Sequence, residues 1–322
     1  MEWKTRLTEL LGIKYPIIQG SFAGFGDSRL ATSVSEAGGL GMITAGALKT
    51  PENLREDIRR ARSITDRPIA VNLSVGMCPR IDEMRDVAIE EEIPVVETSA
   101  FMAEEHGKKL KQAGIIWIHK VATVEHAVAA ARQGADAVVI VGIEGTGFKS
   151  MRQLPISIAI PMAVKQMDVP VAVAGGIGSG RGLLSALALG GEGVYMGTAF
   201  MATKECPIPE KHKRLLVDSS PSDPAIRDKV LSPPDPERVK KVMEKRGKMS
   251  NNEWLSQVER VLAKEPEHVS TGQIHETLEV LQIAPGSLAV GFIDEIYTVR
   301  ELVDKIIKEA EVVLVQSGLC KS

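Results

Sequence analysis

Two glycine-rich segments in this sequence of 322 residues are the first places where a ligand could bind. One runs from Ala174 to Gly182 and reads AGGIGSGRG, and the other runs from Met196 to Phe200 and reads MGTAF. Glycine allows backbone N–H groups to approach an anion closely, and a helix N-terminus adds a favourable dipole. The segments predict a site for a phosphorylated cofactor or substrate, although glycine-rich loops also occur for reasons of chain geometry alone. A dinucleotide-binding fingerprint does not fit, because no acidic residue follows about 20 positions later at a second strand end.

Lys120 is a further candidate for chemistry, because it closes an apolar run that starts at Ile115. If that run is a strand, its alternating geometry points Lys120 into the centre of the fold and His119 toward the surrounding helices. The alternative is an ordinary surface lysine.

The elements that must position these residues form a repeated pattern. Eight short apolar runs alternate with amphipathic charged stretches over the first two-thirds of the chain, which predicts a parallel sheet with helices on both faces. Eight such units favour a closed (β/α)8 TIM barrel over an open doubly wound sheet, and barrel ligands bind at the C-terminal ends of the strands. The predicted strands are Ile17–Gly20, Gly41–Ala45, Ile69–Leu73, Val95–Ser99, Ile115–Lys120, Ala137–Val141, Val171–Ala174 and Gly193–Met196. The predicted helices include Pro51–Ser63, Ile81–Glu91, Ala103–Ala113, Thr123–Gln133 and Gly182–Leu189.

The pattern changes between Cys206 and Ala284, where strand signals end and proline and charged residues increase. We expect a helical insertion after strand eight, with a helix over Asn252–Ala263, that caps the barrel mouth. Residues 1–205 and 285–322 would form the barrel, and residues 206–284 the cap. The amphipathic stretch Val299–Leu314 predicts a long final helix in the outer layer.

Composition narrows the class of protein. Lys and Arg total 39 against 42 Asp and Glu, for a net charge of -3, which offers no basic excess to bind nucleic acid. Three scattered cysteines, Cys78, Cys206 and Cys320, fit neither a disulfide framework nor a metal site. No apolar run approaches the roughly 20 residues of a membrane span, and the first residues lack a signal-peptide core. We therefore expect a cytoplasmic enzyme with a small-molecule substrate.

Several segments in order resemble the nitronate monooxygenase (2-nitropropane dioxygenase) family, which includes flavin enoyl-acyl-carrier-protein reductases and NADH:quinone reductases. The resemblance spans nearly the whole chain and is weakest in the helical insertion. It implies a barrel that binds FMN, and it suggests a homodimer. The segments that carry it are LGIKYPIIQGSFAG, SEAGGLGMITAG, IHKVATVEHAVAAARQGADAVVIVGIEGTG, AGGIGSGRGLLSALALGGEGVYMGTAFMATKECPIPEKHKR and VGFIDEIYTVRELVDKII.

The resemblance also implies roles for individual residues. The two glycine segments would hold the FMN phosphate, and Asn72 would hydrogen-bond the flavin ring, unless it only caps a loop. Lys120 would lie near the flavin N1 and C2 carbonyl, where a fixed cation stabilises the negative charge of the reduced flavin. The residues implied to bind the cofactor are Gln19, Ala23, Gly24, Asn72, Lys120, Gly147, Gly175, Gly176, Gly197 and Thr198.

One departure from the family pattern limits the chemistry. Family members usually follow strand six with Glu-x-x-Gly-His, whereas this sequence reads EGTGF from Glu144 to Phe148. In the family, that histidine serves as a base toward nitroalkanes, and this sequence has Phe148 in its place. The loss of a general base costs about 10²–10⁴ in rate, so we expect the oxidation of neutral nitroalkanes to be crippled. A nitronate is already deprotonated, and hydride transfer from a nicotinamide to flavin needs no protein base. Glu144 is either a polar group of the site or a hydrogen-bond partner that orients the loop.

These residues predict an FMN-dependent nitronate monooxygenase that uses Lys120 and Glu144, with Phe148 in place of the usual histidine. The alternative on the same barrel is an NAD(P)H-dependent quinone or enoyl-thioester reductase, for which Lys149 or Tyr195 could supply the proton. A barrel that binds a phosphate ligand without redox chemistry is a third interpretation.

Overall fold

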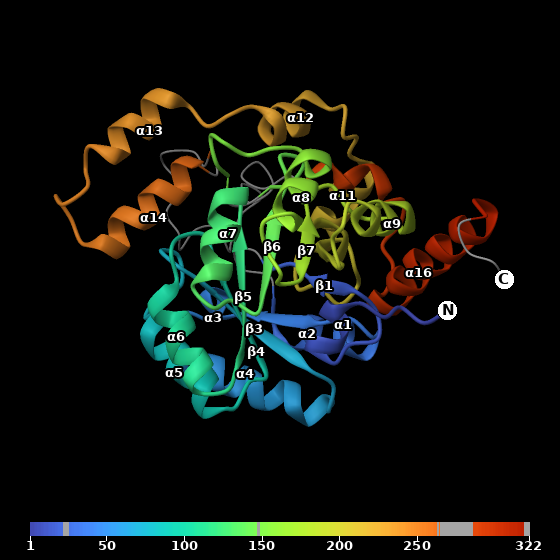
Figure 1. Cartoon of the computed structure of the whole chain (residues 1–322), viewed down its shortest axis with the longest axis horizontal. Coiled ribbons are helices and arrows are strands. Elements are labelled where there is room, and N and C mark those ends of the chain that lie inside the picture. The colour runs from blue at the N-terminus through green and yellow to red at the C-terminus, as the bar shows by residue number, and fades with distance from the viewer. Residues whose placement is uncertain (22–25, 147–148, 263, 265–285, 319–322) are drawn as a thin grey trace.

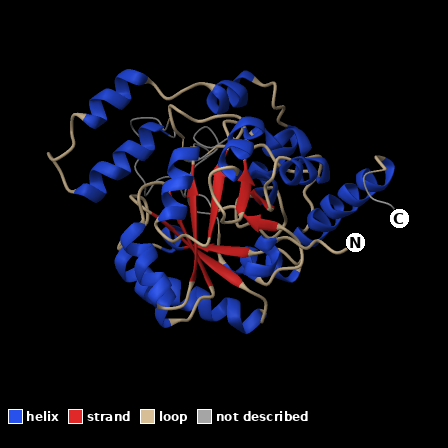
Figure 2. Ribbon diagram, in the orientation of Figure 1, coloured by secondary structure: helices blue, strands red, loops and turns tan. Residues whose placement is uncertain are grey.

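Eight parallel strands surrounded by helices form the centre of the protein (Figure 2) in a computed structural model that describes residues 1–21, 26–146, 149–262, 264 and 286–318. The strands follow the order β1-β8-β7-β6-β5-β4-β3-β2. The predicted (β/α)8 barrel is confirmed, and every predicted strand boundary agrees with the structure to within one residue. The strands are β1 (Ile17–Gln19), β2 (Gly41–Thr44), β3 (Ile69–Ser74), β4 (Val95–Ser99), β5 (Ile116–Val121), β6 (Ala137–Val141), β7 (Val171–Ala174) and β8 (Gly193–Met196).

The seam between β1 and β2 closes the barrel. One bridge joins Ile18 to Leu40, with the Gln19 backbone N donating to the Leu40 carbonyl at 2.9 Å. The buried Gln19 side chain extends this ladder, because its Nε2 donates to the Met42 carbonyl at 2.9 Å and its Oε1 accepts from the Met42 N–H at 3.0 Å. Gln19, for which the family resemblance implies a contact with flavin, therefore uses both polar side-chain atoms to hold the seam.

Helices cover the outer face of the sheet, and several of them, α1, α2, α4, α7 and α9, begin at a capping side chain. In α4, Thr50 accepts a hydrogen bond from the Asn53 N–H and Pro51 occupies the first turn, as the sequence predicts. The helices up to β8 and just after it are α1 (Arg6–Leu11), α2 (Ser28–Glu36), α3 (Ala45–Leu48), α4 (Pro51–Ile64), α5 (Ile81–Glu90), α6 (Glu104–Gln112), α7 (Val124–Arg132), α8 (Ile156–Val164), α9 (Gly180–Ala188) and α10 (Thr198–Met201).

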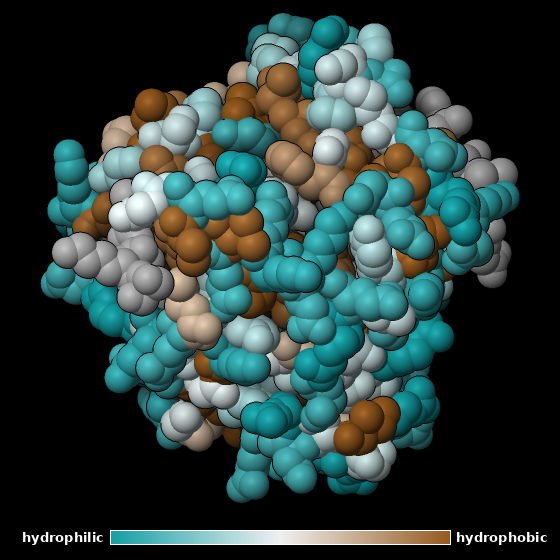
Figure 3. All heavy atoms as spheres, turned by 90° about the vertical axis from the view of Figure 1, so that its right-hand side faces the viewer, coloured by the Kyte–Doolittle hydropathy of each residue, from teal (hydrophilic) through white to brown (hydrophobic). Residues whose placement is uncertain are grey.

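The last helix, α16 (Val299–Gln316), packs against α9 and α2 and so belongs to the outer layer, as expected. Gly180 permits the close approach, because a Cβ there would lie 2.4 Å from the Ile306 carbonyl oxygen. Hydrophilic residues predominate on the face that carries α16 and the N-terminus (Figure 3).

The segment after β8 is helical in its described part. It contains α11 (Glu210–Asp218), α12 (Pro224–Leu231), α13 (Pro236–Met243) and α14 (Asn251–Leu262), and the chain returns through the short helix η1 (Leu288–Phe292). Figure 1 shows α12, α13 and α14 along one edge of the molecule. Leu255 of α14 lies against the loop that follows β3, because a Cβ on Gly76 would be 2.9 Å from the Leu255 Cβ. None of the helices in the described ranges has the length and apolar character of a membrane span.

Candidate active site

A cluster of polar side chains occupies the interior of the barrel toward the C-terminal ends of β3, β4, β5 and β8. The Lys120 Nζ donates to the Tyr195 hydroxyl at 2.8 Å and to the Ser21 Oγ at 3.1 Å. The Tyr195 hydroxyl donates to Glu97 Oε1 at 3.1 Å, and the Asn72 Nδ2 donates to the same oxygen at 2.6 Å. Residues from four strands and the loop after β1 therefore converge on one charged pair.

The orientation of β5 agrees with its predicted alternation. Lys120 points into the cluster, whereas the buried His119 contacts the Thr98 Oγ1 through its Nδ1 at 2.7 Å. His119 also lies beside Trp117, with 6.0 Å between the ring centroids. Burial lowers the pKa of His119 to about 4, so this imidazole stays neutral in the outer core near neutral pH.

Charge separation defines the electrostatics of the cluster. Burial works to lower the pKa of Lys120, but the Glu97 carboxylate, 3.4 Å from Nζ, and Tyr195 outweigh it and raise that pKa above its usual value. Burial, followed by the charge of Glu97, raises the pKa of the Tyr195 phenol. At neutral pH the cluster therefore presents an ammonium and a protonated phenol, which bind and orient an anion well and abstract protons poorly.

The two glycine segments supply backbone N–H groups to the same mouth. Gly175 and Gly176 have φ angles of +115° and +67°, values that favour glycine. Within the described part of the chain, the backbone N–H groups of Gly176, Ile177, Gly197 and Thr198 donate to no acceptor. Free N–H groups on adjacent loops fit an anionic phosphate.

The Thr198 side chain is hydrogen-bonded to Ser287, in the segment where the chain returns to the barrel. Its Oγ1 accepts from the Ser287 N–H at 3.0 Å and is also 3.0 Å from the Ser287 Oγ. The segment just before η1 is thus attached to the second glycine segment, and the Thr198 N–H is the group left to meet a phosphate.

The loop after β6 is fixed by its carboxylate. Both Glu144 oxygens accept from the Ile156 N–H at the start of α8, at 3.1 and 3.3 Å. This contact favours the loop-orienting interpretation of Glu144. Gly147 and Phe148, like Ala23 and Gly24 after β1, lie outside the described residues.

Lys149 follows in the same loop as a buried amine. Its Nζ donates to the Ile143 carbonyl at 2.8 Å. Burial, reinforced by the charge of Lys264 and opposed by Glu144, lowers the pKa of Lys149 to about 7.

Glu97 and Ser21 are site residues that sequence reasoning missed. Glu97 interrupts the apolar run of β4 and shares its inward-facing parity with the neighbouring Val95 and Ser99. A carboxylate on the inner face of a buried strand is a signal that the same alternation argument could have used. Ser21 carries no such signal, because it follows β1 in a loop.

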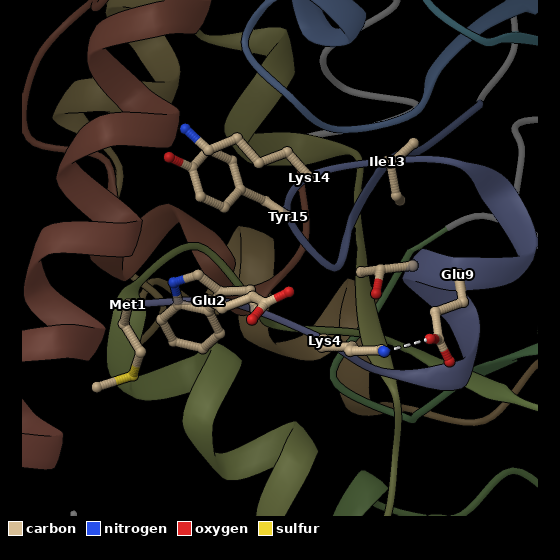
Figure 4. A pocket seen from close by; sticks show the side chains of 9 residues that line it. Met1, Glu2, Lys4, Glu9, Ile13, Lys14 and Tyr15 are labelled. Atoms are coloured by element: carbon tan, nitrogen blue, oxygen red, sulfur yellow. Dashed lines mark ion pairs between the residues drawn. The ribbon is translucent and has the colours of Figure 1, made fainter.

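Other parts of the described chain give weaker evidence for a functional site. Burial raises the pKa of Cys206 to about 11, so its thiol stays protonated and unreactive near neutral pH. Within the described ranges, no group of three or more His, Cys, Asp or Glu side chains could hold a metal ion. A hollow of about 460 Å³ (Figure 4) is lined by Met1, Glu2, Trp3, Lys4, Thr8, Glu9, Ile13, Lys14 and Tyr15. Its residues precede β1 or lie in α1, so it opens at the opposite end of β1 from Ser21.

The fold and the mouth together define a (β/α)8-barrel enzyme whose site suits an anionic ligand. Residues 4–309 match the nitronate monooxygenase family. The chain belongs to this family of flavin-dependent oxidoreductases.

Individual relatives extend this likeness. The chain is 34% identical over 227 residues to an octahydroindene-carboxyl-CoA dehydrogenase of Rhodococcus jostii, and the alignment covers 70% of this chain and 63% of that protein. It is 32% identical over 278 residues to a probable nitronate monooxygenase of Staphylococcus saprophyticus, and the alignment covers 73% of this chain and 78% of that protein. Among solved structures, FabK from Thermotoga maritima is 32% identical, with a TM-score of 0.76 over 98% of this chain and 99% of FabK. Nitroalkane oxidase from Streptomyces ansochromogenes, 22% identical with a TM-score of 0.71 over 97% of this chain and all of that one, shares the fold.

Proposed function

We propose that the protein is an FMN-dependent nitronate monooxygenase that oxidises alkyl nitronates with oxygen. The observation that supports this best is the Lys120 ammonium, kept charged beside Glu97 at the barrel mouth. A nitronate arrives as an anion without a carbon-bound proton to remove, so a site that offers a fixed cation suits it.

The glycine segments support FMN as the cofactor. The free N–H groups of Gly176, Gly197 and Thr198 would hold the phosphate, and Lys120 would stabilise negative charge on the ring system. When bound, the flavin supplies the two-electron chemistry. Glu144 holds the loop after β6 onto α8, and Asn72 fixes the carboxylate behind Lys120.

The surroundings of the mouth complete the proposal. Residues 206–284 would form a cap over it, which the contact between Leu255 and the loop after β3 supports. The family resemblance adds the expectation of a homodimer, and the composition adds that of a cytoplasmic location.

The cofactor and the electron donor can be tested in one preparation. We expect the purified protein to be yellow and to release FMN on denaturation. On anaerobic mixing, propyl nitronate should bleach the flavin, and Lys120→Met should slow that bleaching. A colourless protein that takes up no FMN would refute the redox function.

An NAD(P)H-dependent quinone or enoyl-thioester reductase is the second candidate. The likeness to FabK favours it, at 32% identity over 98% of this chain. Bleaching of the flavin by NADH or NADPH, but not by propyl nitronate, would establish this candidate in place of the first.

A further inference from the structure

Glu97 is a buried charge directly behind Lys120. Its side chain has no exposed surface, whereas 13% of the Lys120 side chain is exposed, and the two charged groups are 3.4 Å apart. The cation therefore lies on the solvent side of the pair and the carboxylate on the inner side. An anion in the mouth meets the ammonium first, with the opposing charge at a greater distance.

The two oxygens of Glu97 have unequal surroundings. Oε1 accepts hydrogen bonds from Asn72 at 2.6 Å, Ser21 at 3.0 Å and Tyr195 at 3.1 Å. Oε2 is buried and has no hydrogen-bond partner within the described part of the chain. Within the described part of the chain, Lys120 is the cation within ion-pair distance of Glu97.

We propose that Glu97 is a positioning residue that weakens the positive field of Lys120 at the mouth and so sets how strongly the site favours a reduced, anionic flavin. The pair is neutral as a whole, and its field at the mouth is that of a dipole with the positive end outward. Removing the carboxylate charge would leave the field of a full cation. Tyr195 and Ser21 hold Nζ in place without adding a formal charge. The inference rests on the proposed FMN site.

Glu97→Gln is the direct test, because it keeps the side-chain size and an oxygen acceptor while removing the charge. With an effective dielectric constant near 20, one charge about 10 Å away changes the relative affinity for reduced and oxidised FMN by about tenfold. We expect the FMN midpoint potential to rise by about 30 mV, the equivalent of tenfold for a two-electron couple. A spectroscopic redox titration of the FMN-loaded protein measures it. Tyr195→Phe, which removes a hydroxyl but no charge, is the control. It should change the relative affinity for reduced and oxidised FMN less than about threefold.

A double variant tests the dipole of the pair itself. Lys120→Met combined with Glu97→Gln leaves no charge in the cluster, so its potential should lie below that of the parent protein, in which the positive end of the pair faces the mouth. This comparison still decides the matter if Glu97→Gln alone does not fold. An unchanged or lowered potential in Glu97→Gln, or a double variant with a potential at or above that of the parent protein, overturns the inference. A protein that takes up no FMN refutes the proposed function, and the inference with it.

Discussion

Two lysines at the barrel mouth have opposite protonation behaviour. Lys120 has a carboxylate 3.4 Å away and stays charged. Lys149 has the Ile143 carbonyl as its hydrogen-bond partner, and burial, together with the charge of Lys264, lowers its pKa to about 7. The difference follows from the counter-charge, because burial alone destabilises an ammonium in either place.

Lys149→Met should flatten the pH dependence of stability. The pKa of Lys149 is about 7 in the folded protein against 10.5 for the free side chain. Between these values the unfolded chain binds the additional proton, so the free energy of unfolding rises with pH, by at most about 1.4 kcal/mol per pH unit. Urea unfolding from about pH 7 to 9 measures the slope, with Lys165→Met on the surface as the control. Equal slopes in Lys149→Met and the parent protein would contradict this account.

Phe148→His should restore a general base to the loop after β6. We expect kcat/KM for a neutral nitroalkane to rise by about 10²-fold, the lower end of what such a base contributes. The rise for the corresponding nitronate should be much smaller, because that substrate has no proton to lose. Steady-state oxygen uptake with both substrates measures this, with Phe148→Leu as the control for pocket size. An equal gain on both substrates would refute the role assigned to this position.

Single elements show what periodicity and composition can predict. The strands are apolar runs bounded by glycine and proline, so their positions follow from the sequence to within one residue. The helix α8 is harder to predict, because ISIAIPMAV is apolar on all sides and has Pro161 inside it. At the site, Lys120 is predictable from strand alternation. The loop residue Ser21 and the role of Gln19 are not, because they depend on which strands become neighbours when the barrel closes.

The Gln19 side chain should contribute to stability through its hydrogen bonds across the seam between β1 and β2. Gln19→Leu keeps the side-chain size but leaves the Met42 N–H and carbonyl without partners. Each unsatisfied buried group costs about 1–3 kcal/mol, so we expect the free energy of unfolding to fall by about 2–5 kcal/mol. Denaturant unfolding measures it, and the exposed Gln112→Leu serves as the matched control. Equal stability of both variants would show that the seam does not need this side chain.

The whole molecule joins a closed barrel to a helical insertion of different character. The barrel strands share two apolar layers, one inside the sheet and one between the sheet and the helices. The described part of the insertion contacts the loop after β3 through Leu255, and its helices α13 and α14 are joined by Trp254, whose Nε1 donates to the Val242 carbonyl at 2.9 Å. Loss of one such contact should therefore loosen the insertion before the barrel unfolds.

Leu255→Ala should separate the stability of the insertion from that of the barrel. We expect limited proteolysis within residues 206–262 to become several-fold faster, because α14 loses the buried part of the Leu255 side chain beyond its Cβ. The thermal unfolding midpoint of the barrel should change little. Met243→Ala, at an exposed position of α13, is the control. A proteolysis rate equal to that of the control would show that this contact does not anchor the insertion.

The pairing of β1 with β8 has a consequence for the synthesis of the protein. Strand β1 pairs with β8 from Ile17 to Gln19, but with β2 through a single bridge. A ribosome that adds roughly 5–20 residues per second makes β8 roughly 10–35 s after β1. During that interval β1 lacks its main partner, and Lys120 lacks the Tyr195 hydroxyl. Barrel closure and assembly of the charged cluster are therefore one late event, which begins only when the eighth strand leaves the ribosome.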